Sequence, residues 1–172
     1  EIESQQEGAV RKGAPTIRLL QVALVGQDGQ ARNAFRSDED ILVRVTHENV
    51  VSTTDLRVIV TIVDEENQPI LGTQNSDCSA SSTYRLEPGV YESSCLIPSN
   101  TFGGKRAYVS VQLVNPKVEH LILKKVLRLT VNFQGYNSPQ ETWEDTFLRP
   151  SLDWETHLVG DKLKSVEDKA IT

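Results

Sequence analysis

Polar and aromatic side chains recur at even spacings along four β-rich segments of this sequence. They form four sets: Arg44 and Thr46; Arg57 and Thr61; Tyr108, Ser110 and Gln112; and Arg128, Thr130 and Asn132. Residues at even spacings along a strand point to the same face of a sheet. On such a face, guanidinium and amide groups can pair with sugar hydroxyls, and an aromatic ring can stack on a sugar ring. If the four strands share one sheet, this face predicts a carbohydrate site, and a plain solvated sheet face is the alternative.

Two aromatic residues outside these strands could extend the same site. Tyr136 and Trp143 lie in a segment that contains Gly135 and Pro139, which are typical of a loop. Packing against the domain and contact with a ligand are both open for them. The candidate carbohydrate-binding residues are therefore Tyr108, Ser110, Gln112, Arg44, Arg57, Arg128, Asn132, Tyr136 and Trp143.

Catalytic and metal-binding patterns are missing from the sequence. It contains no GxSxG, HExxH or Walker-type motif, and Gly103-Gly104-Lys105 is typical of a tight turn. The three histidines, His47, His120 and His157, are far apart and are expected at the surface or at strand edges. We expect no catalytic residue, no metal site and no cofactor, and a hydrolase with an unrecognised site is a minor alternative.

Alternating apolar residues and regularly spaced turns predict an all-β fold. In the segment 107–114, Ala107, Val109, Val111 and Leu113 face one side, and this period of two dominates the chain. Strands are expected at 16–25, 40–46, 56–63, 70–73, 90–97, 107–114, 127–133 and 152–158. Short strands at this spacing indicate an Ig-like or jelly-roll antiparallel β-sandwich.

Charge and length limit the remaining possibilities. The 172 residues carry a formal net charge of −6 without a basic stripe, so nucleic acid is not an expected partner. No apolar stretch approaches the roughly 20 residues of a transmembrane helix. We expect residues 1–14 to be a linker from an upstream nucleotide-binding domain, 15–160 to be the sandwich, and 161–172 to be a tail. Cys78 and Cys95 fit either a disulfide or two free thiols.

The order of these segments resembles one known family, the C-terminal domain of Wzt-type ATP-binding subunits of bacterial polysaccharide ABC exporters. The resemblance covers about residues 15–159 and rests on order and spacing. It follows these segments: Ile17 through Val22-Ala23-Leu24 to Asp28-Gly29, Phe35 with Ile41 to Val45, Val58 to Val63, Leu71-Gly72-Thr73, Cys95 to Pro98, Tyr108 to Leu113, Glu119-His120, Leu127 to Phe133, and Leu148 to Trp154. The chain departs from the family at Arg106, where a glycine is usual.

The resemblance implies a function for the predicted sandwich. It implies non-catalytic recognition of an O-antigen polysaccharide, at its modified non-reducing end, before export by the transporter. It also implies a cytoplasmic location at the inner membrane beside the membrane subunit. A homodimer that exchanges the strand 152–158 is expected from the same resemblance. The alternative function is an Ig-like protein-interaction or dimerisation module that binds no glycan.

Overall fold

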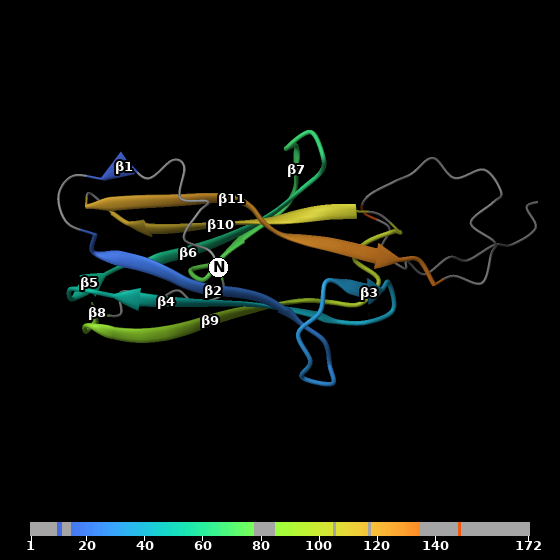
Figure 1. Cartoon of the computed structure of the whole chain (residues 1–172), viewed down its shortest axis with the longest axis horizontal. Helices are drawn as coiled ribbons and strands as arrows, with labels where there is room; N and C mark the ends of the chain where they lie inside the picture. Colours follow the sequence, from blue (N-terminus) through green and yellow to red (C-terminus); the bar gives the residue numbers. More distant parts are fainter. Residues whose placement is uncertain are drawn as a thin grey trace, which may run out of the picture.

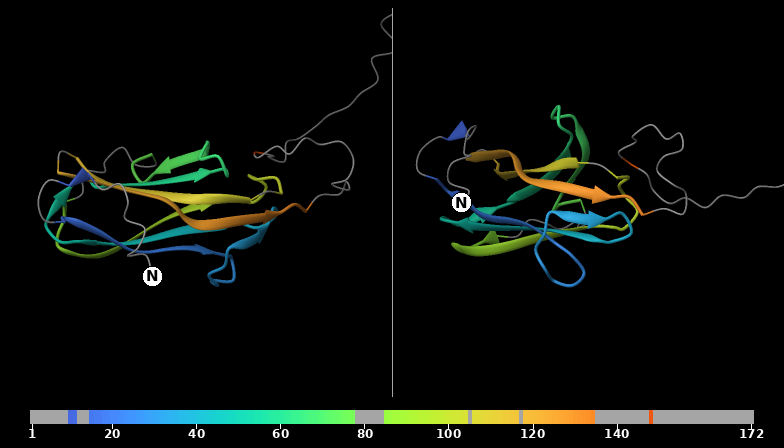
Figure 2. Two further views of the ribbon diagram at one scale, coloured as in Figure 1. Left: turned by 45° about the horizontal axis from the view of Figure 1, so that its top comes forward. Right: turned by 45° about the vertical axis from the view of Figure 1, so that its right-hand side comes forward.

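The computed structural model describes residues 10–11, 15–77, 85–104, 106–116, 118–134 and 148. These residues form two packed β-sheets with no helix long and apolar enough to cross a membrane in the part of the chain described. Figure 1 shows the larger sheet above the smaller one, and Figure 2 shows the two layers from other directions. The predicted all-β sandwich is confirmed.

The larger sheet, called sheet A here, has six strands. Their order is β1 (Val10–Arg11), β11 (Glu119–Asn132), β10 (Arg106–Asn115), β6 (Arg57–Val63) and β7 (Pro69–Gln74), and β3 (Ala34–Arg36) also pairs with β11. The β3–β11 pairing is parallel, whereas every other pairing in sheet A is antiparallel. Sheet A therefore carries three of the four polar-aromatic segments.

The smaller sheet, called sheet B here, has three antiparallel strands. They are β2 (Ile17–Val25), β4 (Ile41–Asn49) and β9 (Gly89–Ile97), with β4 in the middle. A separate two-stranded pair joins β5 (Thr53–Thr54) to β8 (Arg85–Leu86). The short strands β3, β5 and β8 were not predicted, and the expected strand at 152–158 lies outside the described residues.

The core lies between the two sheets and follows the predicted alternation. In β10, the side chains of Ala107, Val109, Val111 and Leu113 are almost fully buried. Phe35, next to β11, is the largest fully buried side chain. Burying one large aliphatic or aromatic side chain of this kind contributes about 1.5–3 kcal/mol. The inward faces of sheets A and B thus hold the fold together and leave the other faces of both sheets exposed.

A buried carboxylate connects the two sheets where the chain enters β2. Glu119, at the start of β11, accepts hydrogen bonds at Oε2 from the Thr16 backbone N–H (2.7 Å) and from Thr16 Oγ1 (2.8 Å). The Ile17 N–H donates to the same oxygen at 3.3 Å. Glu119 is 5% exposed, so this side chain fixes the first residues of sheet B against sheet A from inside the molecule.

A bulge divides β11 into two halves. Val109 of β10 pairs with Leu127, but Val111 pairs with Leu123, so β11 has two extra residues at this point. Lys125 lies in the bulge with φ at 52°, in the left-handed region that non-glycine residues seldom adopt. Because the insertion is even, the buried residues before and after it remain on the same face of sheet A.

Candidate functional site

Most of the predicted carbohydrate-binding residues lie on the outer face of sheet A. Tyr108 and Arg128 are direct cross-strand partners in β10 and β11, and both flank buried inward residues. Gln112 lies further along β10 on the same face, and Asn132 lies at the exposed end of β11. The predicted residues of β6, β10 and β11, which include Arg57, Tyr108 and Arg128, therefore belong to one sheet.

Arg44 is the exception, because its strand belongs to the other sheet and the condition that all four strands share one sheet is not met. It lies in β4, the middle strand of sheet B, and its Nε is 3.2 Å from Glu92 Oε1. The alternation correctly predicted that Arg44 points outward. It could not show which sheet would contain the strand, because strand pairing is decided by contacts distant in sequence.

Two other candidates, Tyr136 and Trp143, lie outside the described residues, so their roles remain predictions. Arg57 is on sheet A, but it pairs in register with Val114 rather than with Tyr108. Val114 lies six positions after Tyr108 in β10, which corresponds to about 20 Å along the strand. Arg57 also lies 3.3 Å from Asp55 Oδ2, so it belongs to a separate end of the face.

Lys125, in the bulge of β11, covers one face of the Tyr108 ring. The Lys125 ammonium lies 4.8 Å from the centre of the Tyr108 ring and donates a 2.7 Å hydrogen bond to the Glu65 carbonyl. The Lys125 backbone N–H donates to Ser110 Oγ at 3.0 Å. A cation over an aromatic ring covers one face of it, so a sugar could stack on that face only after Lys125 moves. Ser110 is largely buried, and its hydroxyl holds the bulge through this hydrogen bond.

The middle of the outer face contains a second internal contact. Gln112 Oε1 and His120 Nε2 are 2.9 Å apart, so the ring nitrogen donates to the amide oxygen. Within the described part of the chain, the amide nitrogen of Gln112 has no hydrogen-bond partner and can serve a ligand. Ile59 and Ile122 flank Gln112 on either side and are half-buried, which gives this part of the face an apolar border.

A cleft between the two sheets was not predicted from the sequence. It has a volume of about 640 Å³ and opens between the edge strands β7 and β9. Its apolar floor is formed by Val43, Val45, Val58 and Val60. The residues that line its sides are Leu71 to Asn75 and Ser93 to Pro98. Figure 1 shows β7 projecting away from sheet B, so the two sheets separate at this edge.

Cys95 lines the cleft as a free, half-buried thiol. Desolvation raises the pKa of Cys95, because burial disfavours the thiolate. Cys78, its possible disulfide partner in the sequence, lies outside the described residues. The signal that could have located this cleft is the mixed character of β9, where Ser93 and Cys95 occupy inward positions opposite Val45 and Val43.

His47 is buried, so the prediction of a surface or edge histidine is wrong for this residue. It is 1% exposed on the inward side of β4, and its ring stacks on Tyr91 with centroids 5.9 Å apart. Burial lowers the pKa of His47, and a hydrogen bond with Asn49 opposes this effect. No group of three or more histidine, cysteine, aspartate or glutamate side chains in the described chain could hold a metal ion.

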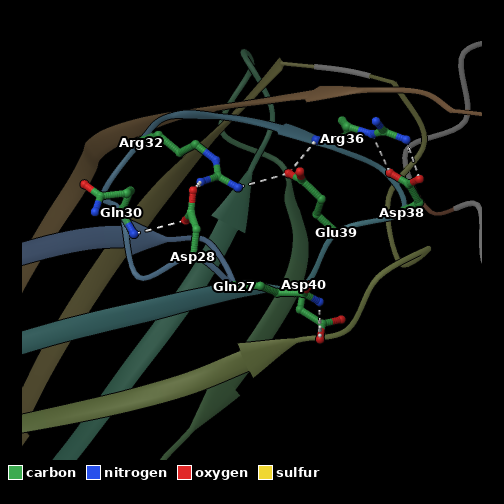
Figure 3. A network of polar contacts seen from close by, with 8 residues as sticks. All are labelled: Gln27, Asp28, Gln30, Arg32, Arg36, Asp38, Glu39 and Asp40. Atoms are coloured by element: carbon green, nitrogen blue, oxygen red, sulfur yellow. Dashed lines mark hydrogen bonds and ion pairs between the residues drawn. The ribbon is translucent and has the colours of Figure 1, made fainter.

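A network of ion pairs closes one end of the sandwich, where the connections to β3 meet (Figure 3). Arg32 contacts Asp28 Oδ1 at 2.7 Å and Glu39 Oε2 at 3.2 Å, and its guanidinium lies over Phe35. Arg36 bonds to both oxygens of Asp38. The network joins two arginines to three carboxylates by ion pairs, so it stabilises the loop structure at this end.

The carboxylates at this end are stabilised in their charged form. The Gln30 backbone N–H and then Arg32 lower the pKa of Asp28, and the Ser99 backbone N–H and Gln27 lower that of Asp40. The turn before Arg32 needs a glycine, because Gly29 has φ at 76° and donates to the Gly26 carbonyl at 2.9 Å. The chain therefore turns at Gly26 to Gly29, directly after β2.

Comparison with known proteins identifies the fold. No protein-family model and no curated protein sequence matches the chain. Among solved structures, a Niemann-Pick type C2 protein from the Japanese carpenter ant aligns with a TM-score of 0.44 at 8% identity, over 72% of this chain and 97% of that one. The C-terminal domain of Wzt aligns with a TM-score of 0.64 at 10% identity, over 89% of this chain and 91% of that one. The resemblance inferred from the sequence is thus confirmed for the fold: this chain has the β-sandwich architecture of the C-terminal domain of Wzt.

Proposed function

We propose that this chain is a non-catalytic carbohydrate-recognition domain that binds an O-antigen polysaccharide for export by an ABC transporter. In this proposal it acts in the cytoplasm, at the inner membrane, beside the membrane subunit of the transporter. The outer face of sheet A is the binding surface, and the modified non-reducing end of the polysaccharide is the part recognised.

The pairing of Tyr108 with Arg128 is the observation that carries this proposal. The two residues are direct neighbours across β10 and β11 on an exposed sheet face. Arg128 is exposed and forms no ion pair with any described residue, so its donors are free for a ligand. Asn132 adds an amide on the same strand. The shared fold with the C-terminal domain of Wzt supports the proposal without adding any contact.

Calorimetry of this chain against the O-polysaccharide of its own source organism tests the proposal, with a foreign O-polysaccharide as control. We expect heat with the cognate polymer alone. The double variant Tyr108→Ala/Arg128→Gln should lose this binding while keeping its circular dichroism spectrum. Arg44→Gln is the matched control, because Arg44 is an outward arginine on the other sheet. Equal losses in both variants would exclude the outer face of sheet A as the site.

The cleft between β7 and β9 favours a second function, that of a protein-interaction or dimerisation module. Both strands end their sheets and carry backbone groups that a further strand could pair with, above an apolar floor. In this proposal the domain forms a homodimer, with exchange of the strand 152–158 between subunits. This function is compatible with glycan binding on the opposite side of sheet A.

Charge at the cleft mouth tests this second function. Ser93→Arg places a cation on the inward side of β9, where an inserted strand would leave it desolvated. We expect analytical ultracentrifugation to show a dimer for the wild type and a monomer for Ser93→Arg. Val90→Arg is the control, because Val90 is 63% exposed on the same strand and does not line the cleft. A wild-type monomer at all concentrations would contradict this function.

A further inference from the structure

The outer face of sheet A holds a group of cations that have no carboxylate partner among the described residues. Its members are Arg106, Lys124, Lys125 and Arg128, all in β10 and β11. We call them the cation cluster. Arg106 and Arg128 lie on the same face as Tyr108, and Lys125 covers the Tyr108 ring. Lys124 is exposed and follows the buried Leu123, so it also points outward.

The cluster differs from every other arginine whose side chain the structure describes. Each of those arginines is ion paired, as follows: Arg18 with Glu48, Arg32 with Asp28 and Glu39, Arg36 with Asp38, Arg44 with Glu92, Arg57 with Asp55, and Arg85 with Glu87. The cluster has no ion pair within the described ranges. In a protein of net charge −6, unmatched positive charge on one small area is unusual and concentrates anions there.

Local structure holds this charge in place. Lys125 is fixed at both ends, because its backbone N–H donates to Ser110 and its ammonium donates to the Glu65 carbonyl. Its backbone also keeps the left-handed conformation, which non-glycine residues seldom adopt. The acidic turn between β6 and β7 is adjacent, and Lys125 bonds there to the Glu65 carbonyl rather than to a carboxylate.

From this distribution we infer that the glycan bound by the outer face of sheet A is acidic, with carboxylate or phosphate groups that contact the cation cluster. The inference rests on the proposed function and names the class of polysaccharide that it concerns. A guanidinium group binds two oxygens of either anion with two parallel hydrogen bonds. Arg106 and Arg128 supply these donors, Lys125 adds a point charge over Tyr108, and Lys124 adds another further along β11.

Chemical neutralisation of the polysaccharide tests the inference and identifies the anion. Calorimetry would compare the native O-polysaccharide of the source organism with two treated samples. One has its carboxylates reduced to hydroxymethyl groups after carbodiimide activation, and the other has its phosphates removed with mild hydrofluoric acid. We expect one treatment to weaken binding about tenfold or more, and raising NaCl from 0.05 to 0.5 M to weaken the native interaction.

Two triple variants assign the effect to the cluster. Arg106→Gln/Lys124→Gln/Arg128→Gln should bind the native polymer at least tenfold more weakly, and should distinguish poorly between native and neutralised samples. Arg18→Gln/Arg36→Gln/Arg85→Gln removes the same charge elsewhere and should bind within about twofold of the wild type. Normal binding by the first variant, or equal loss in both, would overturn the inference.

The remaining outcomes separate this inference from the proposed function. If both neutralised polymers bind as tightly as the native one, glycan recognition stands and the acidic class is wrong. If the native polymer gives no heat, both proposals fail. Sedimentation with vesicles of phosphatidylcholine and phosphatidylglycerol at 3:1 tests whether the cation cluster binds an anionic membrane instead. Binding to these vesicles without binding to the polysaccharide would identify an anionic membrane surface as the partner and overturn the inference.

Discussion

At the scale of single residues, His47 couples the stability of the sandwich to pH. Its ring is buried against Tyr91, and burial lowers its pKa below the ordinary value of about 6.5. As pH falls below this value, His47 therefore takes up a proton in the unfolded chain before it does so in the folded chain. The stability due to neutral His47 is fully present above about pH 6.5 and decreases below it, by at most about 1.4 kcal/mol per pH unit.

The variant His47→Phe isolates this effect, because it keeps a ring against Tyr91 and cannot titrate. Urea unfolding at pH 7, 6 and 5 should show a steeper fall in the free energy of unfolding for the wild type than for the variant. The carboxylates titrate equally in both proteins, so the difference belongs to His47. Parallel pH profiles for the two proteins would contradict the assignment.

Glu119 is expected to contribute more to stability than any exposed carboxylate in an ion pair. Its Oε2 accepts hydrogen bonds from both Thr16 and Ile17 in a buried position. Glu119→Gln should lower the free energy of unfolding by about 1.5–3 kcal/mol, because bonds to a charged group are lost. Glu48→Gln removes only an exposed pair with Arg18 and should cost less than about 1 kcal/mol. Chemical denaturation of both variants gives the comparison, and similar losses would refute it.

At the scale of the elements, the bulge of β11 explains the main error in predicting strands from the sequence. The strand was expected at 127–133, but it begins at Glu119. Leu121, Leu123, Leu127 and Leu129 are inward at odd positions, and Lys125 interrupts the series where alternation would bury it. The two extra residues turn Lys125 outward and restore the alternation beyond it. A lone charge at an inward position therefore indicated a bulge rather than the end of a strand.

Two substitutions at Lys125 measure the strain of this bulge. Lys125→Ala and Lys125→Gly both remove the contacts with Tyr108 and Glu65, but only glycine adopts φ near 52° without a steric penalty. We expect the alanine variant to unfold at about 1 kcal/mol lower stability than the glycine variant. Equal denaturation midpoints would show that the backbone relaxes at this position.

Prediction of the site from the sequence was limited because the sequence did not show which strands share a sheet. Period two correctly gave the exposed or buried side for Tyr108, Gln112, Arg128 and Arg44. It gave no partner strand, so Arg44 was grouped with residues of a different sheet. The contacts that already occupy Ser110 and Gln112, and the cation over Tyr108, depend on side chains brought together by long-range pairing, so composition alone could not show them.

At the scale of the whole molecule, Cys95 reports on the opening between the sheets. Its raised pKa keeps it in the unreactive thiol form, so a Cys78→Ser protein should react with a maleimide more slowly at pH 7 than a free cysteine. If a second copy fills the cleft, the rate should also fall as protein concentration rises. Rapid labelling at neutral pH would contradict the burial of this side chain, and a kinetic series from pH 7 to 9.5 measures it.

The short strand β1 has a mechanical consequence for the cation cluster. Val10 and Arg11 pair with His120 and Glu119, at one end of the strand that carries Lys124, Lys125 and Arg128. Tension applied through the chain before residue 10 would first load these two register pairs, and then the Glu119 clamp on Thr16 and Ile17. The two-residue pairing of β1 is the weaker contact and is loaded first. It would therefore let β1 detach while the hydrogen bonds of Glu119 keep the sandwich and its outer face in shape.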